Sequence, residues 1–322
     1  EWGFGMDLGF LGNRLNFIFD YYDKTSIDRL FLEPLPSFTG FSGIRTNVGT
    51  FGSSGIELSL NANIIRMGNW TWDVFAFSDI LLKQETIKLP DNGTELNRIG
   101  GSFVYNPDDP TGDPILVGGL AEGERAGAVY GYVNEGIIQN WDQADAYNAN
   151  HYDELMAGSA NKRQFKKPGD YMWADLNGDG VVNSLDREFK GYETHNKRHG
   201  LTSTLRWTPG FGSFLFSFTL ESMQGHIVED WMGMRMMAQA QGGDRPSLYT
   251  RNSWLEEGDN GFARYTWANR HTGWNYERKS DPFLQKADYI ALRQIELKYT
   301  LPQAWAKTIR LQEVSTFVTG YN

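Results

Sequence analysis

Hydrophobic and polar residues alternate along several long segments of the chain. Within residues 55–66, Leu58 and Leu60 fall on one side, while Glu57 and Asn61 fall on the other. This period of two, held without a slip, predicts β-strands whose two faces meet different surroundings. The same alternation recurs along the chain and predicts an all-β protein.

The segments pair through short turns, and long connections separate the pairs. The predicted strand pairs are 2–10 with 14–30, 52–66 with 69–82, 200–208 with 213–221, and 283–301 with 309–322. The long connections, which are polar and rich in Gly, Asn and Asp, are 31–51, 83–199 and 222–282. Short turns at one end and long loops at the other are typical of outer-membrane barrels, in which the long loops lie outside the cell. The pattern therefore predicts a transmembrane antiparallel β-barrel segment of about eight strands, with large extracellular loops at 83–199 and 222–282.

Strand length and aromatic placement favour a membrane barrel over a soluble sandwich. A tilted strand needs about nine to eleven residues to cross a bilayer, whereas strands of soluble proteins centre on about five or six. Most of the predicted strands reach the longer figure. Trp and Tyr residues also lie near the strand ends, where the membrane–water interfaces would be. A soluble β-sandwich with unusually long strands is the alternative.

Composition adds three constraints. The chain lacks an apolar run of the ~20 residues that a membrane helix requires, and its mean hydropathy of -0.49 is compatible with a barrel that has a wet interior and large loops. A formal net charge of -10 argues against a nucleic-acid partner. The absence of cysteine leaves neither a disulfide framework nor a thiol nucleophile.

Both ends of the sequence read as strands, and open strand edges are costly in lipid. Eight strands would close only a narrow barrel, which rarely carries loops this long. We therefore expect the chain to be part of a larger barrel.

An ordered set of motifs resembles the barrel of SusC/RagA-type TonB-dependent transporters over nearly the whole chain. The matching segments are Asp20–Thr25, Asn47–Gly49, Gly55–Leu58, Glu122–Gly123, Pro168–Asp170, Asp175–Gly180, Asp288–Tyr289 and Leu301–Pro302. The resemblance implies a complete barrel of about 22 strands, so that residues 1–322 would be a partial barrel without the plug domain, the TonB box and the final strands. It also implies a location in the bacterial outer membrane, coupling to TonB through the absent N-terminal region, and a SusD-like lipoprotein partner.

The strongest chemical motif is segment 175–186, which has the spacing of an EF-hand calcium loop. Oxygen-bearing side chains occupy loop positions 1, 3, 5, 9 and 12, in the order Asp175, Asn177, Asp179, Asn183 and Asp186. Gly180 stands at position 6, where the loop turns sharply, and Val181 at position 7 can offer its backbone carbonyl. The motif predicts Ca²⁺, with Mg²⁺ as the alternative ion. The competing interpretation is an Asn/Asp/Gly-rich turn that satisfies its own backbone.

Aromatic residues and methionines are frequent in the second long loop. The predicted contacts with a partner protein, on a short helix, are Trp231, Met234 and Arg235, because interface cores are enriched in these types. The predicted contacts with substrate are Trp254, Trp267 and Trp274, because aromatic faces stack on sugars and clamp peptide side chains. Packing of the loop itself is the commoner use of such residues.

The sequence offers no nucleophile motif and no evident pair of catalytic carboxylates, so we predict a transporter rather than an enzyme. The expected function is TonB-dependent import of oligosaccharides or peptides across the outer membrane, together with a SusD-like lipoprotein. Two alternatives stay open. A passive porin would lack a plug domain, and a soluble calcium-stabilised β-sandwich binding module would not depend on detergent.

Overall fold

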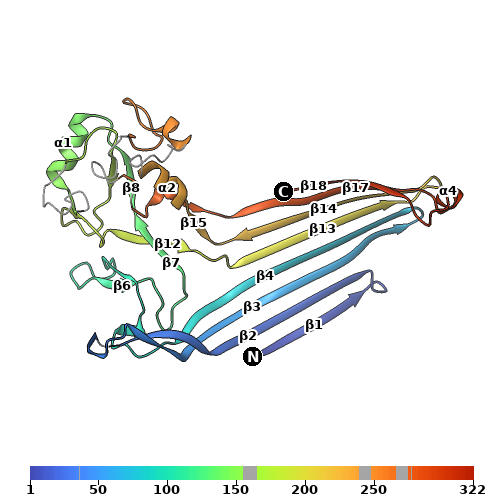
Figure 1. Cartoon of the computed structure of the whole chain (residues 1–322), viewed down its shortest axis with the longest axis horizontal. Coiled ribbons are helices and arrows are strands. Elements are labelled where there is room, and N and C mark those ends of the chain that lie inside the picture. Colours follow the sequence, from blue (N-terminus) through green and yellow to red (C-terminus); the bar gives the residue numbers. More distant parts are fainter. Residues whose placement is uncertain (36, 155–164, 239–247, 266–274, 277) are drawn as a thin grey trace.

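Eight long strands form a single antiparallel sheet in the computed structural model, which describes residues 1–35, 37–154, 165–238, 248–265, 275–276 and 278–322 (Figure 1). The strands, in spatial order, are β1 (Trp2–Phe10), β2 (Leu15–Pro34), β3 (Gly43–Met67), β4 (Trp70–Lys88), β13 (Lys197–Trp207), β14 (Ser213–Gln224), β17 (Tyr289–Thr300) and β18 (Ser315–Tyr321). Every neighbouring pair is antiparallel. The predicted all-β sheet of about eight strands is therefore confirmed.

The four predicted hairpins are present, but several strands differ from their predicted lengths. β2, β3 and β4 are longer, because the β2–β3 hairpin keeps pairing as far as Pro34 and Gly43, and β4 continues to Lys88. The predicted strand 283–301 begins later, at Tyr289, because a short helical turn and a separate short strand precede it. The last short connection contains the helix α4 (Gln303–Thr308). These changes occur where the alternation of residue types fades and pairing is decided by the partner strand.

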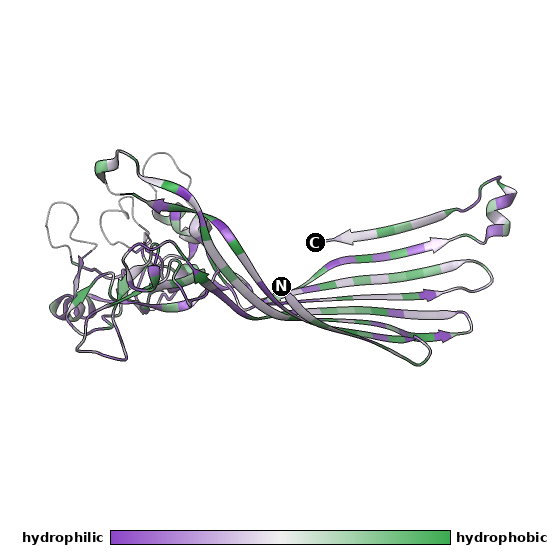
Figure 2. Cartoon of the chain, turned by 90° about the horizontal axis from the view of Figure 1, so that it is seen from below, coloured by the Kyte–Doolittle hydropathy of each residue, from purple (hydrophilic) through white to green (hydrophobic). Residues whose placement is uncertain are grey.

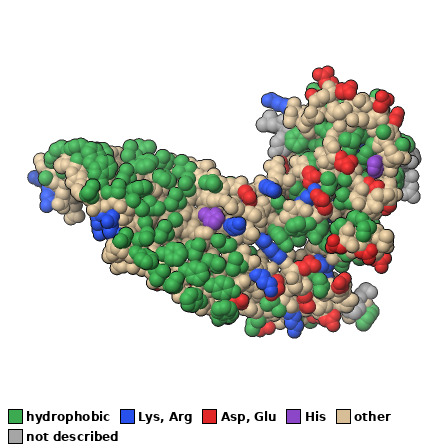
Figure 3. Space-filling model, turned by 180° about the vertical axis from the view of Figure 1, so that it is seen from behind, with side chains coloured by type: hydrophobic (Ala, Val, Ile, Leu, Met, Phe, Trp, Pro, Cys, Tyr) green, Lys and Arg blue, Asp and Glu red, His purple; other side chains and the backbone are tan. Residues whose placement is uncertain are grey.

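The alternation is in register across the sheet. Figure 2 shows hydrophobic and hydrophilic residues interspersed along the strands. Leu60 on β3 lies opposite Phe17 on β2 and Ala76 on β4. Asn61, one residue further, lies opposite Asn16 on β2. The sheet thus has an apolar face and a polar face. Apolar side chains gather over the strands in Figure 3, while acidic and basic side chains are concentrated at the other end of the molecule.

Aromatic rings line the apolar face where the short turns begin. The ring centroids of Trp70 on β4 and Trp207 on β13 are 5.4 Å apart, and those of Trp207 and Phe214 on β14 are also 5.4 Å apart. Phe214 in turn packs 4.8 Å from Tyr299 on β17. A row of rings across four adjacent strands is the arrangement expected of an aromatic girdle at a membrane interface.

The long connections fold into a body at the opposite end of the sheet, which we call the loop module: the described residues of 89–196 and 225–288 (Figure 1). Its strands are β5 (Ser102–Val104), β6 (Ile115–Val117), β7 (Ala128–Tyr132), β8 (Asn134–Ile137), β9 (Tyr152–Asp153), β10 (Tyr171–Trp173), β11 (Val181–Val182), β12 (Arg187–Tyr192), β15 (Ile227–Glu229) and β16 (Leu284–Lys286). Its helices and helical turns are α1 (Trp141–Asn150), α2 (Trp231–Ala238), η2 (Glu95–Asn97), η4 (Leu248–Asn252) and η5 (Asp281–Phe283), and a further turn, η1 (Ser37–Thr39), lies at the tip of the β2–β3 hairpin. The module strands pair two by two: β5–β6, β7–β12, β8–β10, β9–β11 and β15–β16. None of the described helices is long and apolar enough to cross a membrane.

One hydrophobic core holds both long connections together. Tyr132 and Trp173 come from the connection between β4 and β13, whereas Met237, Tyr276 and Phe283 come from the connection between β14 and β17, and all five are buried. Burying large aromatic side chains dominates the energetics of a core of this size. The two long connections therefore pack together as one unit and do not fold separately.

Candidate functional site

The predicted metal loop, residues 175–186, turns as its spacing requires. Gly178 and Gly180 have φ angles of +73° and +80°, a region of backbone conformation that favours glycine. A Cβ at Gly180 would also approach the carbonyl oxygen of Asn150 to 3.2 Å. The sharp bend at loop position 6 is therefore present in the fold.

The loop's acidic side chains bind its own backbone amides. The N–H groups of Gly178 and Gly180 donate to the two carboxylate oxygens of Asp175, at 2.9 and 2.7 Å. The Val181 N–H donates to Asp179 at 2.7 Å. Amides of this kind commonly share a carboxylate with an ion, because each oxygen has more than one lone pair.

The remaining loop oxygens follow the same pattern. Asn177 accepts a hydrogen bond from the Asp179 N–H at 3.1 Å, and Asn183 accepts one from the Leu185 N–H at 2.8 Å. Asp186, which is fully buried, accepts from Leu176 at 2.9 Å and from Asn183 at 2.7 Å. All five predicted side-chain ligands thus accept hydrogen bonds from backbone amides of the loop itself.

Among the described residues, no ion pair joins the carboxylates of Asp175, Asp179 or Asp186 to a basic side chain. Burial raises the pKa of Asp186, and the nearby carboxylates of Asp175 and Asp179 raise it further, although hydrogen bonds from two backbone amides oppose this. Within the described ranges, no three His, Asp or Glu side chains converge closely enough to form a metal site as they stand. The donor set fits a hard cation in chemistry, and the carboxylates would have to draw together around it. Metal binding here stays a prediction.

The loop is connected to three parts of the module. β11 pairs in parallel with β9, which places Val182 beside Asp153. The Leu185 carbonyl accepts a hydrogen bond from the Tyr105 N–H at 2.9 Å. Arg187, which follows the loop directly, begins β12 and lies opposite Tyr132 on β7. The loop is therefore joined to β9, to β12 and to the segment at Tyr105.

Helix α2 carries the predicted partner contacts. Trp231 is 49% exposed, and the guanidinium carbon of Arg235 lies 4.9 Å from the centre of its ring. Met234 instead packs against the hydrophobic core of the module. The exposed methionines of this helix are Met232 and Met236. The partner contacts stay a prediction, and the partial burial of Met234 leaves Met232 and Met236 as the methionines that this helix exposes.

Trp254 is packed within the module rather than presented to solvent. Its indole N–H donates to Gln139 at 3.2 Å, its side chain packs against the core, and a Cβ placed on Gly169 would collide with its ring. This favours the packing role over substrate stacking. The other two predicted substrate contacts, Trp267 and Trp274, lie outside the described residues.

Sequence reasoning missed an aromatic pair on the outside of the module. Trp141, at the start of α1, is 61% exposed, and Phe165 is 52% exposed. Both line a hollow of about 520 Å³ together with Asp145 and Lys167. A Trp directly after the N-cap residue Asn140 was the available signal, because the first turn of a short polar helix has no internal need of an indole.

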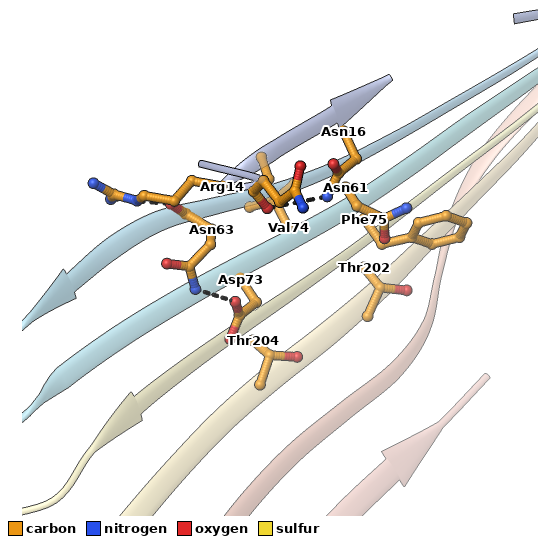
Figure 4. Close-up of a pocket in the computed structure, with 11 residues that line it drawn as sticks. Arg14, Asn16, Asn61, Asn63, Asp73, Val74, Phe75, Thr202 and Thr204 are labelled. Carbon is orange, nitrogen blue, oxygen red and sulfur yellow. Dashed lines mark hydrogen bonds between the residues drawn. The ribbon is translucent and has the colours of Figure 1, made fainter. Parts of the chain in front are cut away.

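The polar face of the sheet is hollowed near the short turns (Figure 4). A cavity of about 280 Å³ lies there, and its lining includes Asn61, Asn63, Asp73, Thr202 and Thr204. The Asn63 amide donates to Asp73 at 2.5 Å. Amides and hydroxyls thus dominate this part of the polar face, and they are groups that contact water or another polar surface readily.

Sequence comparison identifies similar proteins over nearly the full chain. The TonB-dependent receptor P3 of Formosa agariphila is 26% identical over 320 residues, which are 99% of this chain and 28% of that receptor. The TonB-dependent receptor P39 of the same organism is 28% identical, with 92% of this chain and 28% of the receptor covered. The TonB-dependent receptor SusC of Bacteroides thetaiotaomicron is 23% identical, with 94% and 26% covered. No family model matches the chain.

Structural comparison gives the same fold. The RagAB peptide importer in its open-open state superposes with a TM-score of 0.64 at 17% identity, covering 99% of this chain and 30% of that one. The RagAB peptide transporter gives a TM-score of 0.63, also at 17% identity, covering 99% and 31%. The fold is that of a segment of a transmembrane antiparallel β-barrel.

Over nearly its whole length the chain is similar to TonB-dependent receptors, SusC among them, and its fold is that of the matching part of RagAB, which agrees with the resemblance in the ordered motifs. It spans about 28% of the length of the curated relatives that it matches.

Proposed function

We propose that this chain is part of an outer-membrane importer that takes up oligosaccharides or peptides by a TonB-dependent mechanism. The observation that carries the proposal is the register of the sheet, which aligns the apolar residues of neighbouring strands on one face and the polar residues on the other. Such a sheet suits lipid on one side and a wet lumen on the other. No bond is made or broken in this function.

The comparisons support transport and leave the substrate open. The curated relatives carry the name TonB-dependent receptor, and one of them is named SusC. The structural neighbours are described as a peptide importer and a peptide transporter. These names favour active import over passive diffusion, because a porin needs neither TonB nor a receptor.

A SusD-like surface lipoprotein is the proposed partner, with the loop module as its docking surface. The proposal draws on α2, where Trp231, Met232 and Met236 are exposed beside Arg235. Aromatic residues, Met and Arg are the types that interface cores enrich. The exposed Trp141 and Phe165 provide a second apolar area on the same module.

The partner prediction can be checked by purification. Full-length importer extracted in mild detergent should carry a lipoprotein at equal stoichiometry. Trp231→Ala combined with Arg235→Ala should weaken the complex at least about tenfold and lower the recovered lipoprotein, because a Trp or Arg hot spot costs about 2 kcal/mol or more when truncated. The matched control is Leu255→Ala, an exposed apolar residue elsewhere in the module. Purification of the barrel alone under all mild conditions would contradict the partner and the importer proposal together.

Calcium in loop 175–186 is proposed as a stabiliser of the loop module. The support is the spacing, the bend at Gly180 and the carboxylates of Asp175 and Asp179, which contribute to raising the pKa of Asp186. A divalent cation would relieve that repulsion. Extracellular calcium modules bind at about 10⁻⁴ to 10⁻³ M, a range that suits an outer loop.

Removing calcium should therefore loosen the module while the barrel stays folded. In millimolar calcium, the full-length protein should resist limited proteolysis between residues 165 and 196, and chelation should expose that region. Asp179→Ala should remove the calcium dependence, since it deletes one ligand from the exposed half of the loop. Asp108→Ala, an exposed carboxylate outside the loop, is the control. Identical proteolysis with calcium and with chelator would rule out the metal site.

A further inference from the structure

A row of charged residues crosses the polar face of four adjacent strands. Asp20 on β2 lies opposite Glu57 on β3, Glu57 lies opposite Asp79 on β4, and Asp79 lies opposite Arg198 on β13. Directly opposed residues have Cβ atoms about 4.5–5.5 Å apart. The row is therefore continuous, with three carboxylates followed by a guanidinium.

The acidic half of the row is not neutralised by neighbours. Throughout the described part of the chain, no residue gives a hydrogen bond or an ion pair to the side chains of Asp20, Glu57 or Asp79. Like charges directly opposite each other on neighbouring strands are destabilising. Within the described strands this repulsion is not offset, so the acidic half can accept a cationic group from outside the sheet.

In the basic half, the carboxylate of Glu221 binds two arginines. Arg198 donates to Glu221 at 3.1 Å, and Arg293 donates to the other oxygen of Glu221 at 2.8 Å. Arg293 also donates to the hydroxyl of Tyr289 at 2.9 Å. Two guanidinium groups share one carboxylate, so this half keeps one unit of positive charge in a fixed position.

Aromatic rings lie between and beside the charges. A Cβ on Gly200 would overlap the ring of Phe77, so this ring lies directly against the glycine backbone. A Cβ on Gly55 would likewise collide with the ring of Tyr22. The guanidinium carbon of Arg198 is 5.6 Å from the centre of the Phe77 ring. The row therefore combines charge of both signs with apolar surface.

The row lies at the loop end of the sheet. β3 continues from Glu57 to its end at Met67, a rise of about 33 Å at about 3.3 Å per residue. With the tilt of about 40° that barrels adopt, this corresponds to about 25 Å of height, which is the height of an outer-membrane apolar band. The mainly neutral Asn and Thr hollow of Figure 4 lies near the short turns instead. The charged row is thus at the mouth of the lumen, below the loop module.

We infer that this row binds an oligopeptide by its two free ends, with the terminal ammonium on the acidic half and the terminal carboxylate on Arg198 and Arg293. The inference rests on the proposed import function and narrows its substrate to a zwitterionic chain. Neutral oligosaccharides have no charges to match the two halves. From Glu57 to Tyr289, whose hydroxyl Arg293 contacts, there are four strand steps of about 4.8 Å, or about 19 Å, which is the reach of five or six extended residues.

The test uses the full-length importer with its partner and three probes: penta-alanine with free ends, the same peptide acetylated and amidated, and maltopentaose. Titration calorimetry should show that free penta-alanine binds at least about tenfold more tightly than the capped peptide. Glu57→Gln with Asp79→Asn should remove most of that preference, and Arg198→Gln should remove the part that depends on the carboxylate. Asp73→Asn, on the same face near the short turns, is the matched control. Higher salt should weaken the free peptide selectively.

Equal affinity for free and capped peptide, or tighter binding of maltopentaose, would overturn the inference. So would a loss of thermal stability in the ligand-free Glu57→Gln, Asp79→Asn protein, because it would mean that another segment of the protein occupies the row. The proposed function is judged separately by uptake into intact cells. Uptake that depends on the gene but ignores these charges overturns only the peptide inference, whereas uptake that is unchanged by deleting the gene overturns import itself.

Discussion

Replacing Asp153 with alanine is expected to destabilise the loop module by about 3–5 kcal/mol. The carboxylate accepts two hydrogen bonds from Arg278, at 3.0 and 2.8 Å, and lies 3.3 Å from the ammonium of Lys166. All three side chains are buried almost completely. Deleting Asp153 removes the carboxylate that both cations contact in a space that water does not reach, and removing one partner of a buried ion pair is strongly destabilising.

Aromatic rings around Arg278 help to stabilise its buried positive charge. The guanidinium carbon of Arg278 is 4.8 Å from the ring centre of Trp173 and 4.9 Å from that of Tyr132. Two aromatic faces stabilise a desolvated cation. Burial by itself raises the pKa of Asp153, but Arg278 and Lys166 outweigh burial through their charges and hydrogen bonds and leave this pKa below its ordinary value.

The lowered pKa of Asp153 predicts how the stability of the loop module depends on pH. A carboxyl group whose pKa is lowered in the folded state contributes stability that is fully present above its unfolded pKa of about 3.9 and is lost as the pH falls below it. The module should therefore become sensitive to protease at acid pH before the barrel unfolds.

The loss of stability can be measured by thermal unfolding of the full-length protein. Tryptophan fluorescence and proteolysis of residues 89–196 follow the unfolding. Asp153→Ala should open the module at a lower temperature while the barrel keeps its heat-modifiable mobility on gels. Asp108→Ala, with its exposed carboxylate, should change little. Equal stability of the two variants would show that the buried group contributes nothing to holding the module.

Replacing Leu60 with arginine is expected to cost about 2–4 kcal/mol in barrel stability, because Leu60 lies on the apolar face near the middle of the spanning part of β3. Its cross-strand neighbours are Phe17 and Ala76, so the new guanidinium finds no polar partner in its row. The matched variant is Asn61→Arg, one residue further along the same strand.

Asn61 lies opposite Asn16, lines the polar hollow of Figure 4, and should accept arginine at much lower cost. Reversible folding of the full-length barrel into lipid vesicles, titrated with urea, measures both variants. Equal losses at positions 60 and 61 would contradict the assignment of the two faces.

How far the sequence predicted the fold can be judged from β3. Its alternation from Ile56 to Leu60 depends only on the period of two, which fixes the face of every residue once the strand is recognised. The extension of β3 back to Gly43 was missed, because that part pairs with β2 without a regular alternation of its own. Partner strands decide such boundaries, and a single segment does not contain that information.

The candidate functional residues were likewise predictable only in part. The bend of loop 175–186 was predictable, since Gly180 stands where the turn requires a positive φ. The inward turn of Met234 was not, because it depends on a core built from distant loop residues.

By its own pattern, the sequence determined the class of fold, the short turns, the two faces of the sheet and the oxygen-rich loop, because each of these is a local property of neighbouring residues. Only the tertiary structure decided which distant residues meet. Asp153 and Arg278 come from different connections, and Asp20, Glu57 and Asp79 come from three strands whose register is fixed by backbone pairing. Charge interactions fall off with distance and change with burial, so their consequences appear only once the chain is folded.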